Sequence, residues 1–431
     1  MDKTILKLFE AFNGPGSVTT DSRAVKQGDI FFALKGDNFN GNRFAEAALH
    51  LGASIAVVDD PAFAKENGYL LVDDSLRTLQ QFARQYRESL KTTTFIGITG
   101  SNGKTTSKEL FHRVLSQKYK TTATSGNLNN HIGVPLTLLS IPEDTEMAII
   151  EMGANHIGEI ATLCEIARPE YGLITNIGKA HLEGFGGFEG VKKAKSELYD
   201  FIRKTDGKIF ISNDNHILTG LAVGLNQVKY GSIDGVFCKG DLTAQIPFIQ
   251  LDVECGETQL KIESSLIGAY NFENILSAVC AGFYFEVPAS EISTAIETYH
   301  PDNNRSQIIE TGKNTLILDA YNANPSSMNA ALVNFFQGDY QNRVIVLGEM
   351  LELGEQSEAE HRQVIEQISN ALIDQVFLVG DGFKSFANNR MLWFDTVESM
   401  ISWLKDHPIT GKHFLIKGSR KNRLEKLVEH L

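Results

Sequence analysis

FIGITGSNGKTTSKELF, residues 95–111, is an apolar run followed by a glycine-containing turn and then by a segment that favours helix. This order is typical of phosphate-binding loops, because glycines let backbone N–H groups close around an anion. Gly100 and Gly103 provide that freedom, Lys104 adds a positive charge, and the Thr105 hydroxyl can bind a magnesium ion. The stretch therefore predicts a nucleotide triphosphatase type of fold.

The predicted loop is shorter than the general P-loop. The pattern GxxxxGK[ST] would place its first glycine at position 98, where this chain has Ile98. The chain instead contains a GxxGKTT variant at residues 100–106. This departure indicates a class of nucleotide-binding protein whose phosphate loop is shorter than the general P-loop.

Composition limits the class of protein. With 431 residues, 42% hydrophobic and 22% charged, the chain is that of a globular enzyme with two to three domains. Its net charge of −13 argues against nucleic-acid binding, which needs clustered Lys and Arg, but permits small anionic ligands. Four widely spaced cysteines and the lack of any run of about 18 apolar residues predict a cytoplasmic protein without disulfides or membrane insertion.

Apolar runs alternate with helical segments along most of the chain, which predicts an α/β fold with mostly parallel sheets. We expect three domains: a small N-terminal α/β module at 1–90, a central P-loop-type ATPase domain at 91–304 and a C-terminal Rossmann-like domain at 305–431. The strands that define them are expected within residues 29–34, 54–60, 95–100, 147–154, 171–178, 208–214, 314–325, 343–350, 375–382 and 413–420, with a β-rich interval at 227–267.

Polar residues that follow apolar strands are candidates for the site, because ligands of open α/β sheets bind at the carboxyl ends of strands. Glu151 follows one strand and could serve magnesium as a Walker-B-like acid, or it could cap the next turn. His181 lies in a glycine-rich loop and could be a ligand or simply a packed or surface histidine. Tyr321, Asn322 and Asn324 follow a third strand.

Four further residues are candidates for the site, and three of them also have a purely structural interpretation. Lys195 lies on a predicted helix, where lysines are usually solvated. Arg305 follows a polar hinge and could reach a γ-phosphate on domain closure, or it could be a surface charge. Asn271 and Asn274 lie one helical turn apart and could bind one ligand such as an adenine edge, although Asn271 could instead cap its helix.

These segments together resemble the Mur ligase family of ATP-dependent amide-forming enzymes. The resemblance covers essentially the whole chain, and TGSNGKTT at 99–106 is similar to that family's short P-loop. The other matching segments include IIEMGANHIGEI at 149–160, TNIGKAHLEGFGG at 175–187, LDAYNANPSSM at 318–328, VLGEMLELGE at 346–355 and IKGSR at 416–420.

The resemblance implies a role for each candidate. Lys104, His181, Lys195 and Arg305 would be catalytic. The resemblance also implies an ATP site that comprises Gly100, Ser101, Asn102, Gly103, Lys104, Thr105, Thr106, Asn271, Asn274, Arg305 and Asp319. Two magnesium ions are implied, with Thr105 and Glu151 at one site and with His181 and Lys195, if carbamylated, at the other. The implied substrate contacts are Ser22, Arg23, Asn129 and Asn130 for the UDP-linked substrate, and Tyr321, Asn322 and Asn324 for a dipeptide.

Within the family, the segments look like those of members that join D-alanyl-D-alanine to UDP-N-acetylmuramoyl-tripeptide, acting as monomers. The alternatives are another Mur-type ligase that adds a single amino acid, a folylpolyglutamate synthase-like ligase, or a regulatory protein with a residual P-loop. Three positions depart from the family pattern: the segment at 40–42 reads NGN instead of DGH, Tyr270 replaces a histidine, and Asn304 replaces a glycine.

Overall fold

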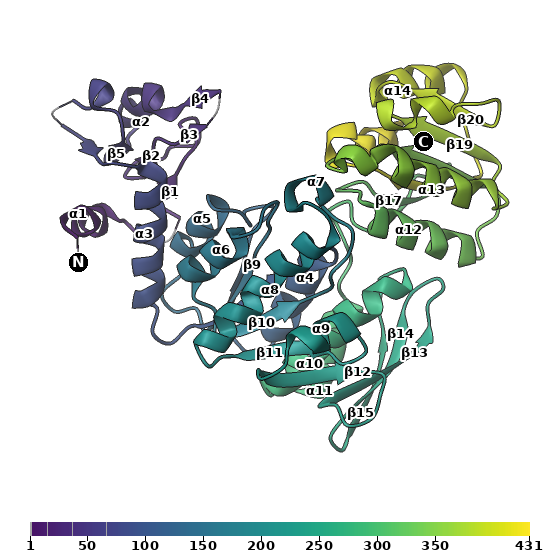
Figure 1. The fold of residues 1–431 in the computed structure, drawn as a ribbon, viewed down its shortest axis with the longest axis horizontal. Helices are drawn as coiled ribbons and strands as arrows, with labels where there is room; N and C mark the ends of the chain where they lie inside the picture. Colours follow the sequence, from purple (N-terminus) through teal and green to yellow (C-terminus); the bar gives the residue numbers. More distant parts are fainter. Residues whose placement is uncertain (1, 15, 37, 66) are drawn as a thin grey trace.

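The computed structural model describes residues 2–14, 16–36, 38–65 and 67–431, which form three α/β units along the chain (Figure 1). Each unit has its own sheet, of four, nine and six strands, and the first unit adds a two-stranded ribbon. The predicted α/β fold with mostly parallel sheets is confirmed.

The N-terminal unit is a parallel sheet in the order β1-β2-β5-β6. Its strands are β1 Val18–Thr19, β2 Ile30–Phe32, β5 Ile55–Val58 and β6 Tyr69–Leu71, and the ribbon pairs β3 Lys35–Gly36 with β4 Phe39–Asn40. Its helices are α1 Lys3–Ala11, α2 Ala45–His50 and α3 Ser75–Ser89. The side chain of Asp74 caps α3 by accepting from the Arg77 backbone N–H, which is why the helix begins there.

The central unit is a nine-stranded sheet in the order β15-β14-β13-β12-β11-β10-β7-β9-β8, antiparallel only at its β13-β14-β15 end. Its strands are β7 Thr94–Thr99, β8 Thr121–Ala123, β9 Met147–Glu151, β10 Tyr171–Ile174, β11 Lys208–Ser212, β12 Asn226–Gly231, β13 Cys238–Ala244, β14 Gln250–Cys255 and β15 Thr258–Glu263. Its helices are α4 Lys104–Leu115, α5 Gly133–Leu139, α6 Glu159–Ala167, α7 Leu182–Phe185, α8 Phe188–Lys204, α9 His216–Leu221, α10 Phe272–Tyr284 and α11 Ala289–Glu297.

Helices cover both faces of the central sheet, which explains the continuous apolar runs that predicted its strands. Phe95 of β7 belongs to the core shared with α5, α6 and α8. Its neighbours Ile96 and Ile98 belong to the core shared with α4, α10 and α11. The strand is therefore buried on both sides, and the loop that follows it emerges at the carboxyl end of the strand, between its neighbours β10 and β9.

The C-terminal unit is a six-stranded sheet in the order β16-β17-β21-β18-β19-β20, parallel except for β16. Its strands are β16 Gln307–Glu310, β17 Thr315–Asp319, β18 Arg343–Gly348, β19 Gln375–Val379, β20 Met391–Phe394 and β21 His413–Lys417. Its helices are α12 Pro325–Gln337, α13 Ser357–Ser369 and α14 Val397–Asp406, followed by short 3-10 turns at the C-terminus. The parallel order of β17 to β21 agrees with the predicted Rossmann-like arrangement.

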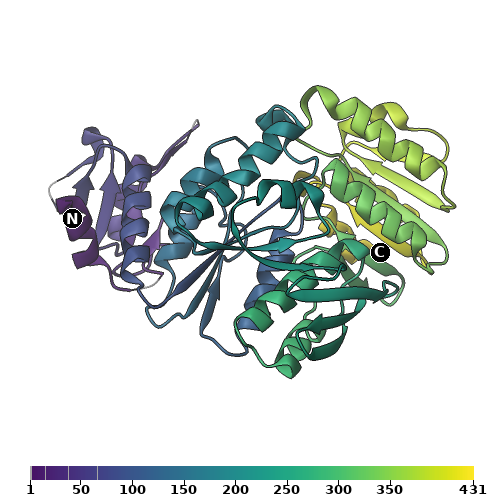
Figure 2. The same ribbon diagram turned by 60° about the horizontal axis from the view of Figure 1, so that its bottom comes forward.

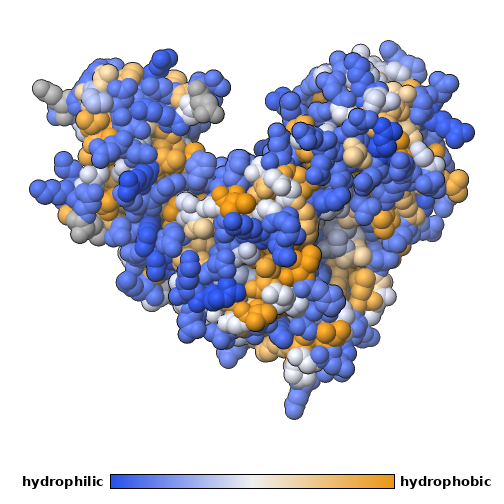
Figure 3. Space-filling model, viewed as in Figure 1, coloured by the Kyte–Doolittle hydropathy of each residue, from blue (hydrophilic) through white to orange (hydrophobic). Residues whose placement is uncertain are grey.

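The N-terminal and C-terminal units lie at opposite ends of the central unit (Figures 1 and 2). Helix α3 packs against α5 and α6 and so joins the first unit to the second. A wide notch separates the two outer units on the face shown in Figure 3. Across the described ranges, none of the helices combines the length and apolar character needed to cross a bilayer.

Candidate active site

The phosphate loop joins the end of β7 to the start of α4, as predicted. Gly100 has φ +145°, and a Cβ there would lie 2.0 Å from the Thr175 hydroxyl. Gly103 has φ +79°, and a Cβ there would lie 2.5 Å from Asn274 Oδ1. Both positions require glycine, because a side chain would collide and the backbone of Gly103 is left-handed.

A second segment, residues 175–178, holds this loop in shape. The Ser101 backbone N–H donates to the Asn176 carbonyl at 3.0 Å, and the Asn102 N–H donates to Asn176 Oδ1 at 3.0 Å. The Thr175 hydroxyl donates to the Asn102 carbonyl at 2.6 Å. The loop is thus preformed within the central unit.

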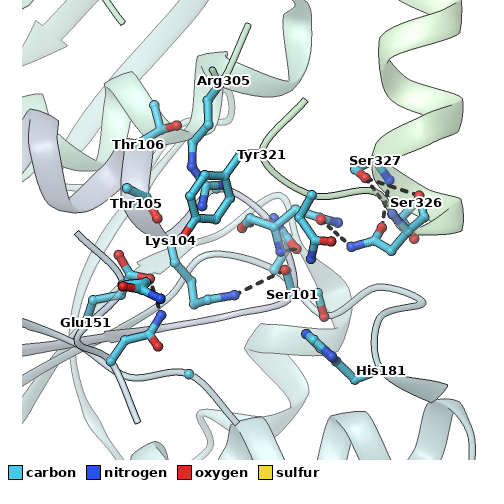
Figure 4. Close-up of a pocket in the computed structure, with 18 of the residues that line it drawn as sticks. Ser101, Lys104, Thr105, Thr106, Glu151, His181, Arg305, Tyr321, Ser326 and Ser327 are labelled. Atoms are coloured by element: carbon cyan, nitrogen blue, oxygen red, sulfur yellow. Dashed lines mark hydrogen bonds between the residues drawn. The ribbon is translucent and has the colours of Figure 1, made fainter. Parts of the chain in front are cut away.

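Lys104 points back into the loop that precedes it. Its Nζ donates to the Gly100 carbonyl at 2.7 Å and to the Ser101 carbonyl at 3.2 Å (Figure 4). Burial lowers the pKa of Lys104 to about 8; the negative charge of Glu151 opposes this shift and the positive charge of Arg305 adds to it. An anion bound in the loop would favour the charged form of this amine.

A cavity of about 470 Å³ lies over the loop and is lined by the central and C-terminal units. The structure brings most of the predicted residues together there. Those that line the cavity are Ser101, Asn102, Gly103, Lys104, Thr105, Thr106, Asn129, Asn130, Glu151, His181, Asn271, Asn274, Arg305, Asp319, Tyr321, Asn322 and Asn324. Gly100, Lys195, Ser22 and Arg23 are not among the lining residues.

Glu151 ends β9 and is almost completely buried, at 2% exposure. Its Oε1 accepts from Asn129 Nδ2 at 2.8 Å, whereas Oε2 is buried and has no hydrogen-bond partner among the described residues. The alternative role as a turn cap is therefore not what the structure shows. An unpartnered carboxylate oxygen on the same cavity as the Thr105 hydroxyl suits a hard cation (Figure 4).

The described residues contain no group of three or more His, Cys, Asp or Glu side chains arranged to hold a metal ion. Mg²⁺ needs fewer protein ligands, because it is usually held by one or two carboxylates together with phosphates and water. Glu151 and Thr105 fit that kind of site better than a cage built wholly from protein.

His181 has φ +51° and lies on the wall of the cavity. Its Nδ1 contacts a carboxylate oxygen of Glu352, which belongs to the C-terminal unit. The imidazole lowers the pKa of Glu352 through this contact. The ring is therefore held across the interface between two units, which differs from a freely exposed surface histidine.

Lys195 lies on α8 and is 1% exposed, so the alternative of a solvated lysine is wrong. Burial, together with repulsion from Lys104, lowers the pKa of Lys195 to about 7. Its Nζ lies 5.2 Å from the centre of the Phe185 ring. An amine in this environment is uncharged in a large fraction of molecules at neutral pH and can then act as a nucleophile.

Asn271 and Asn274 lie close together, as their spacing predicted, and they are hydrogen-bonded to each other. Asn274 Nδ2 donates to Asn271 Oδ1 at 2.8 Å, and Asn271 Nδ2 donates to the Ile267 carbonyl at 2.9 Å. Asn271 precedes α10 but its side chain makes no capping hydrogen bond. The capping alternative for Asn271 is therefore wrong, and the pair instead borders the cavity beside Gly103.

The C-terminal unit contributes the opposite wall. Asp319 at the end of β17 pairs with Lys417 at the end of β21, with Oδ2 and Nζ 2.6 Å apart. The Arg305 guanidinium stacks on the Tyr321 ring, with Cζ 3.8 Å from the ring centre (Figure 4). The buried Nε of Arg305 has no hydrogen-bond partner among the described residues. Arg305 is thus held over the cavity, which excludes the alternative of a free surface charge.

Asn324 connects the two walls directly. Its Oδ1 accepts from the Ser327 backbone N–H and caps α12, with Pro325 at the first helical position. Its Nδ2 donates to Asn102 Oδ1 at 2.8 Å, although the two residues are 222 positions apart. One side chain therefore both begins a helix and contacts the phosphate loop.

Ser22 and Arg23 lie apart from this cavity, in the N-terminal unit. Arg23 is exposed and pairs with Asp21 at 2.7 Å. The notch seen in Figure 3 separates that unit from the C-terminal unit. The structure does not bring these two residues to the phosphate loop, so a role for them requires a ligand that extends across the notch.

Several residues of the site were not singled out from the sequence. Lys417 ends a strand, and the rule that identified Glu151 could have identified it too. Asn176 follows β10 and could have been found in the same way. Glu352 lies in a loop and carried no such signal, because only the packing of the two units brings it to His181.

Comparison with known proteins identifies the class of protein to which this fold belongs. The family description "Mur ligase middle domain" matches residues 98–282, "Mur ligase, glutamate ligase domain" matches residues 304–420, and "Mur ligase family, catalytic domain" matches residues 16–87. The chain belongs to the Mur ligase family.

Its relatives narrow the class further. The chain is 35% identical to the UDP-N-acetylmuramoyl-tripeptide–D-alanyl-D-alanine ligase of Bacillus subtilis (strain 168), over 96% of this chain and 92% of that protein. The crystal structure of MurF from Acinetobacter baumannii superimposes with a TM-score of 0.86 at 29% identity, over 99% of this chain and 97% of that one. The MurF ligase of Thermotoga maritima in complex with ADP gives a TM-score of 0.85 at 25% identity, over 100% and 98% of the two chains.

Proposed function

We propose that this protein is an ATP-dependent ligase that joins D-alanyl-D-alanine to UDP-N-acetylmuramoyl-tripeptide, which yields the pentapeptide precursor of peptidoglycan. The observation that carries the proposal is that one cavity is lined by Lys104 and Glu151 of the central unit and by Arg305 and Asn324 of the C-terminal unit. Similarity to a ligase of that name over 96% of the chain favours this acceptor over a single amino acid or a folate-linked substrate.

The first step activates the terminal carboxylate of the tripeptide. A carboxylate is a poor electrophile, so an oxygen of this group attacks the γ-phosphorus of ATP, and ADP leaves as the acyl phosphate forms. Two anions must approach each other in this step. Lys104 in the phosphate loop and Arg305 on the opposite wall are the cations that offset their repulsion.

The second step makes the amide bond. The free amine of D-alanyl-D-alanine attacks the acyl carbon, the tetrahedral intermediate expels inorganic phosphate, and the amine loses a proton. We assign Tyr321, Asn322 and Asn324 to the placement of the dipeptide, because all three lie on the cavity wall supplied by the C-terminal unit. Closure of that wall protects the acyl phosphate from water.

Two magnesium sites belong to the proposal. Glu151 and Thr105 would hold one ion, and His181 with a carbamylated Lys195 would hold the other. Bound magnesium would neutralise phosphate charge. What this chain contributes is the unpartnered Glu151 Oε2 and a buried Lys195 amine whose lowered pKa suits reaction with carbon dioxide.

The remaining residues are assigned to ATP and to the UDP-linked substrate. ATP would contact the loop residues 100–106 together with Asn271, Asn274 and Asp319. The UDP-linked substrate would extend from Ser22 and Arg23 to Asn129 and Asn130. We assign these roles to units at 1–90, 91–304 and 305–431, and we propose a monomer of the cytoplasm, where ATP and nucleotide-linked precursors are found.

An isotope experiment tests the chemistry. UDP-N-acetylmuramoyl-tripeptide labelled with ¹⁸O in its terminal carboxylate is incubated with ATP, magnesium and D-alanyl-D-alanine, and the released phosphate is analysed by mass spectrometry. We expect one ¹⁸O atom in the phosphate, because the acyl oxygen leaves with phosphorus. Unlabelled phosphate would exclude the acyl phosphate.

The acceptor is tested separately. Phosphate release is compared with D-alanyl-D-alanine, meso-diaminopimelate, lysine and glutamate as amine substrates. We expect strong stimulation by the dipeptide alone. Stimulation by one of the single amino acids instead would assign the chain to another ligase of the family, and stimulation by none would favour a regulatory protein.

A further inference from the structure

The loop at residues 178–183 is attached to the C-terminal unit at several points. Lys179 Nζ lies 2.6 Å from Oε1 of Glu360, and the Lys179 backbone N–H donates to the Ser326 hydroxyl at 2.9 Å. The Glu183 N–H donates to the Glu352 carbonyl at 3.3 Å, and His181 contacts the Glu352 carboxylate. One short loop of the central unit therefore binds three separate elements of its neighbour.

The pair formed by Lys179 and Glu360 differs from the ion pairs on the protein surface. The Glu360 side chain is only 6% exposed, whereas that of Lys179 is 46% exposed. A buried carboxylate is costly unless a cation pairs with it. Among the described residues, the cation that pairs with Glu360 comes from the other unit, so this interaction exists only while the two units are docked.

We propose that Lys179 and Glu360 form a latch that holds the C-terminal unit over the phosphate loop. Both are positioning residues, and their importance for catalysis rests on the function proposed above. The latch acts two residues from His181 in the sequence, on the loop that also packs beside Asn102 and Ser326. Docking through Lys179 thereby brings Asn324 to the cavity and Glu352 to His181 at the same time.

The latch predicts a change of shape that can be measured without any substrate. In Lys179→Glu, the carboxylate introduced at position 179 faces Glu360, and repulsion replaces attraction. We expect small-angle X-ray scattering of the ligand-free variant to give a larger radius of gyration than the wild-type protein. Because Lys179 is partly exposed, this variant is expected to fold, and its circular dichroism spectrum verifies that.

A charge swap tests whether the pair itself is responsible. The double variant Lys179→Glu with Glu360→Lys restores opposite charges, so the wild-type radius of gyration is expected to return. The matched control is Glu358→Lys, which reverses a charge on the same helix α13. Glu358 pairs with Arg362 within that helix and is exposed, so its reversal leaves the shape unchanged.

Kinetics provide the second measurement. Loss of the latch should lower kcat/KM for the dipeptide about tenfold, because the docked arrangement becomes a minor population. The KM for the UDP-linked substrate should change less, since that molecule is assigned to the other two units. A merely structural defect would lower stability and affect all substrates alike.

The scattering and kinetic results separate two kinds of failure. An unchanged radius of gyration in Lys179→Glu, or no recovery in the charge swap, would overturn the latch. If D-alanyl-D-alanine proves not to be the acceptor, the proposed function fails, but the scattering of the ligand-free protein still decides whether the latch exists.

Discussion

The two walls of the cavity are built in different ways. The phosphate loop lies between a strand and a helix that are consecutive in sequence, and residues 175–178 of the same unit hold it. The opposite wall, with Arg305, Asp319 and Tyr321, is formed where the C-terminal unit begins and docks. The first wall forms with its own unit, whereas the second depends on how two units are placed.

This difference separates substitutions into two groups. Changes in the phosphate loop should abolish chemistry without altering the arrangement of the units. Changes in the opposite wall should weaken the second substrate or the docking while the phosphate loop stays intact.

The largest effect is expected at Lys104. Lys104→Met removes the cation of the phosphate loop and should lower kcat by about a thousandfold or more, because preorganised charge stabilisation in a buried site is lost. The measurement is phosphate release with all substrates saturating. Lys192→Met, on the half-exposed surface of α8, is the control and should retain activity. Product formation at the normal rate in Lys104→Met would remove this residue from the mechanism.

A second large effect is expected at Lys195, which belongs to the central unit, as the phosphate loop does. Lys195→Ala should be nearly inactive, with a loss of about a hundredfold or more, since an anionic ligand would be missing from the site. Added formate or acetate should restore part of the rate. The control is Lys193→Ala on the exposed face of the same helix. Full activity without added carboxylate would contradict carbamylation, and an inactive variant without rescue would point to a structural role.

Substitution of Asn324 tests the opposite wall, and we expect it to lower activity less than the two lysine substitutions do. Asn324→Ser keeps a capping oxygen for α12 but is too short to reach Asn102, so stability should change little. We expect kcat/KM for the dipeptide to fall about tenfold, which corresponds to about 1.4 kcal/mol. Steady-state kinetics and thermal unfolding measure the two effects. An equal loss with every substrate would assign Asn324 to the chemical step rather than to placement.

The smallest effect concerns stability and pH. His361 is fully buried on α13, its Nδ1 bonds to the Ser357 carbonyl at 2.7 Å, and its Nε2 accepts from the Met350 N–H at 3.0 Å. Burial lowers the pKa of His361, so below the unfolded pKa of about 6.5 the unfolded chain binds a proton that the folded chain resists. Stability of this unit should therefore decrease as the pH falls below about 6.5, by at most about 1.4 kcal/mol per pH unit.

Denaturant unfolding at pH 7.5 and pH 5.5 measures this dependence. His361→Gln should be less stable than the wild-type protein at pH 7.5 but should lose less stability on acidification. An identical pH dependence in the two proteins would mean that other groups are responsible. Because His361 anchors the segment before Glu352, the experiment also probes how firmly the second wall is supported.

Much of the fold could be predicted from local patterns. The strands of the central and C-terminal sheets are buried on both faces, so they appear in the sequence as apolar runs between polar segments. The phosphate loop could be predicted because glycine is the residue that fits Gly103, with its left-handed backbone beside Asn274. Lys195 was harder, since a lysine on a helix gives no sign of burial until the packing of α8 is known.

The α/β class, the phosphate loop and the set of polar residues at strand ends follow from short-range sequence patterns, because these features depend on neighbours within a few positions. Three contacts are seen only in the folded molecule: Asn324 with Asn102, Glu352 with His181, and Lys179 with Glu360. Such contacts join residues far apart in the chain. They depend on how complete units pack against each other, and no local pattern of residues encodes that placement.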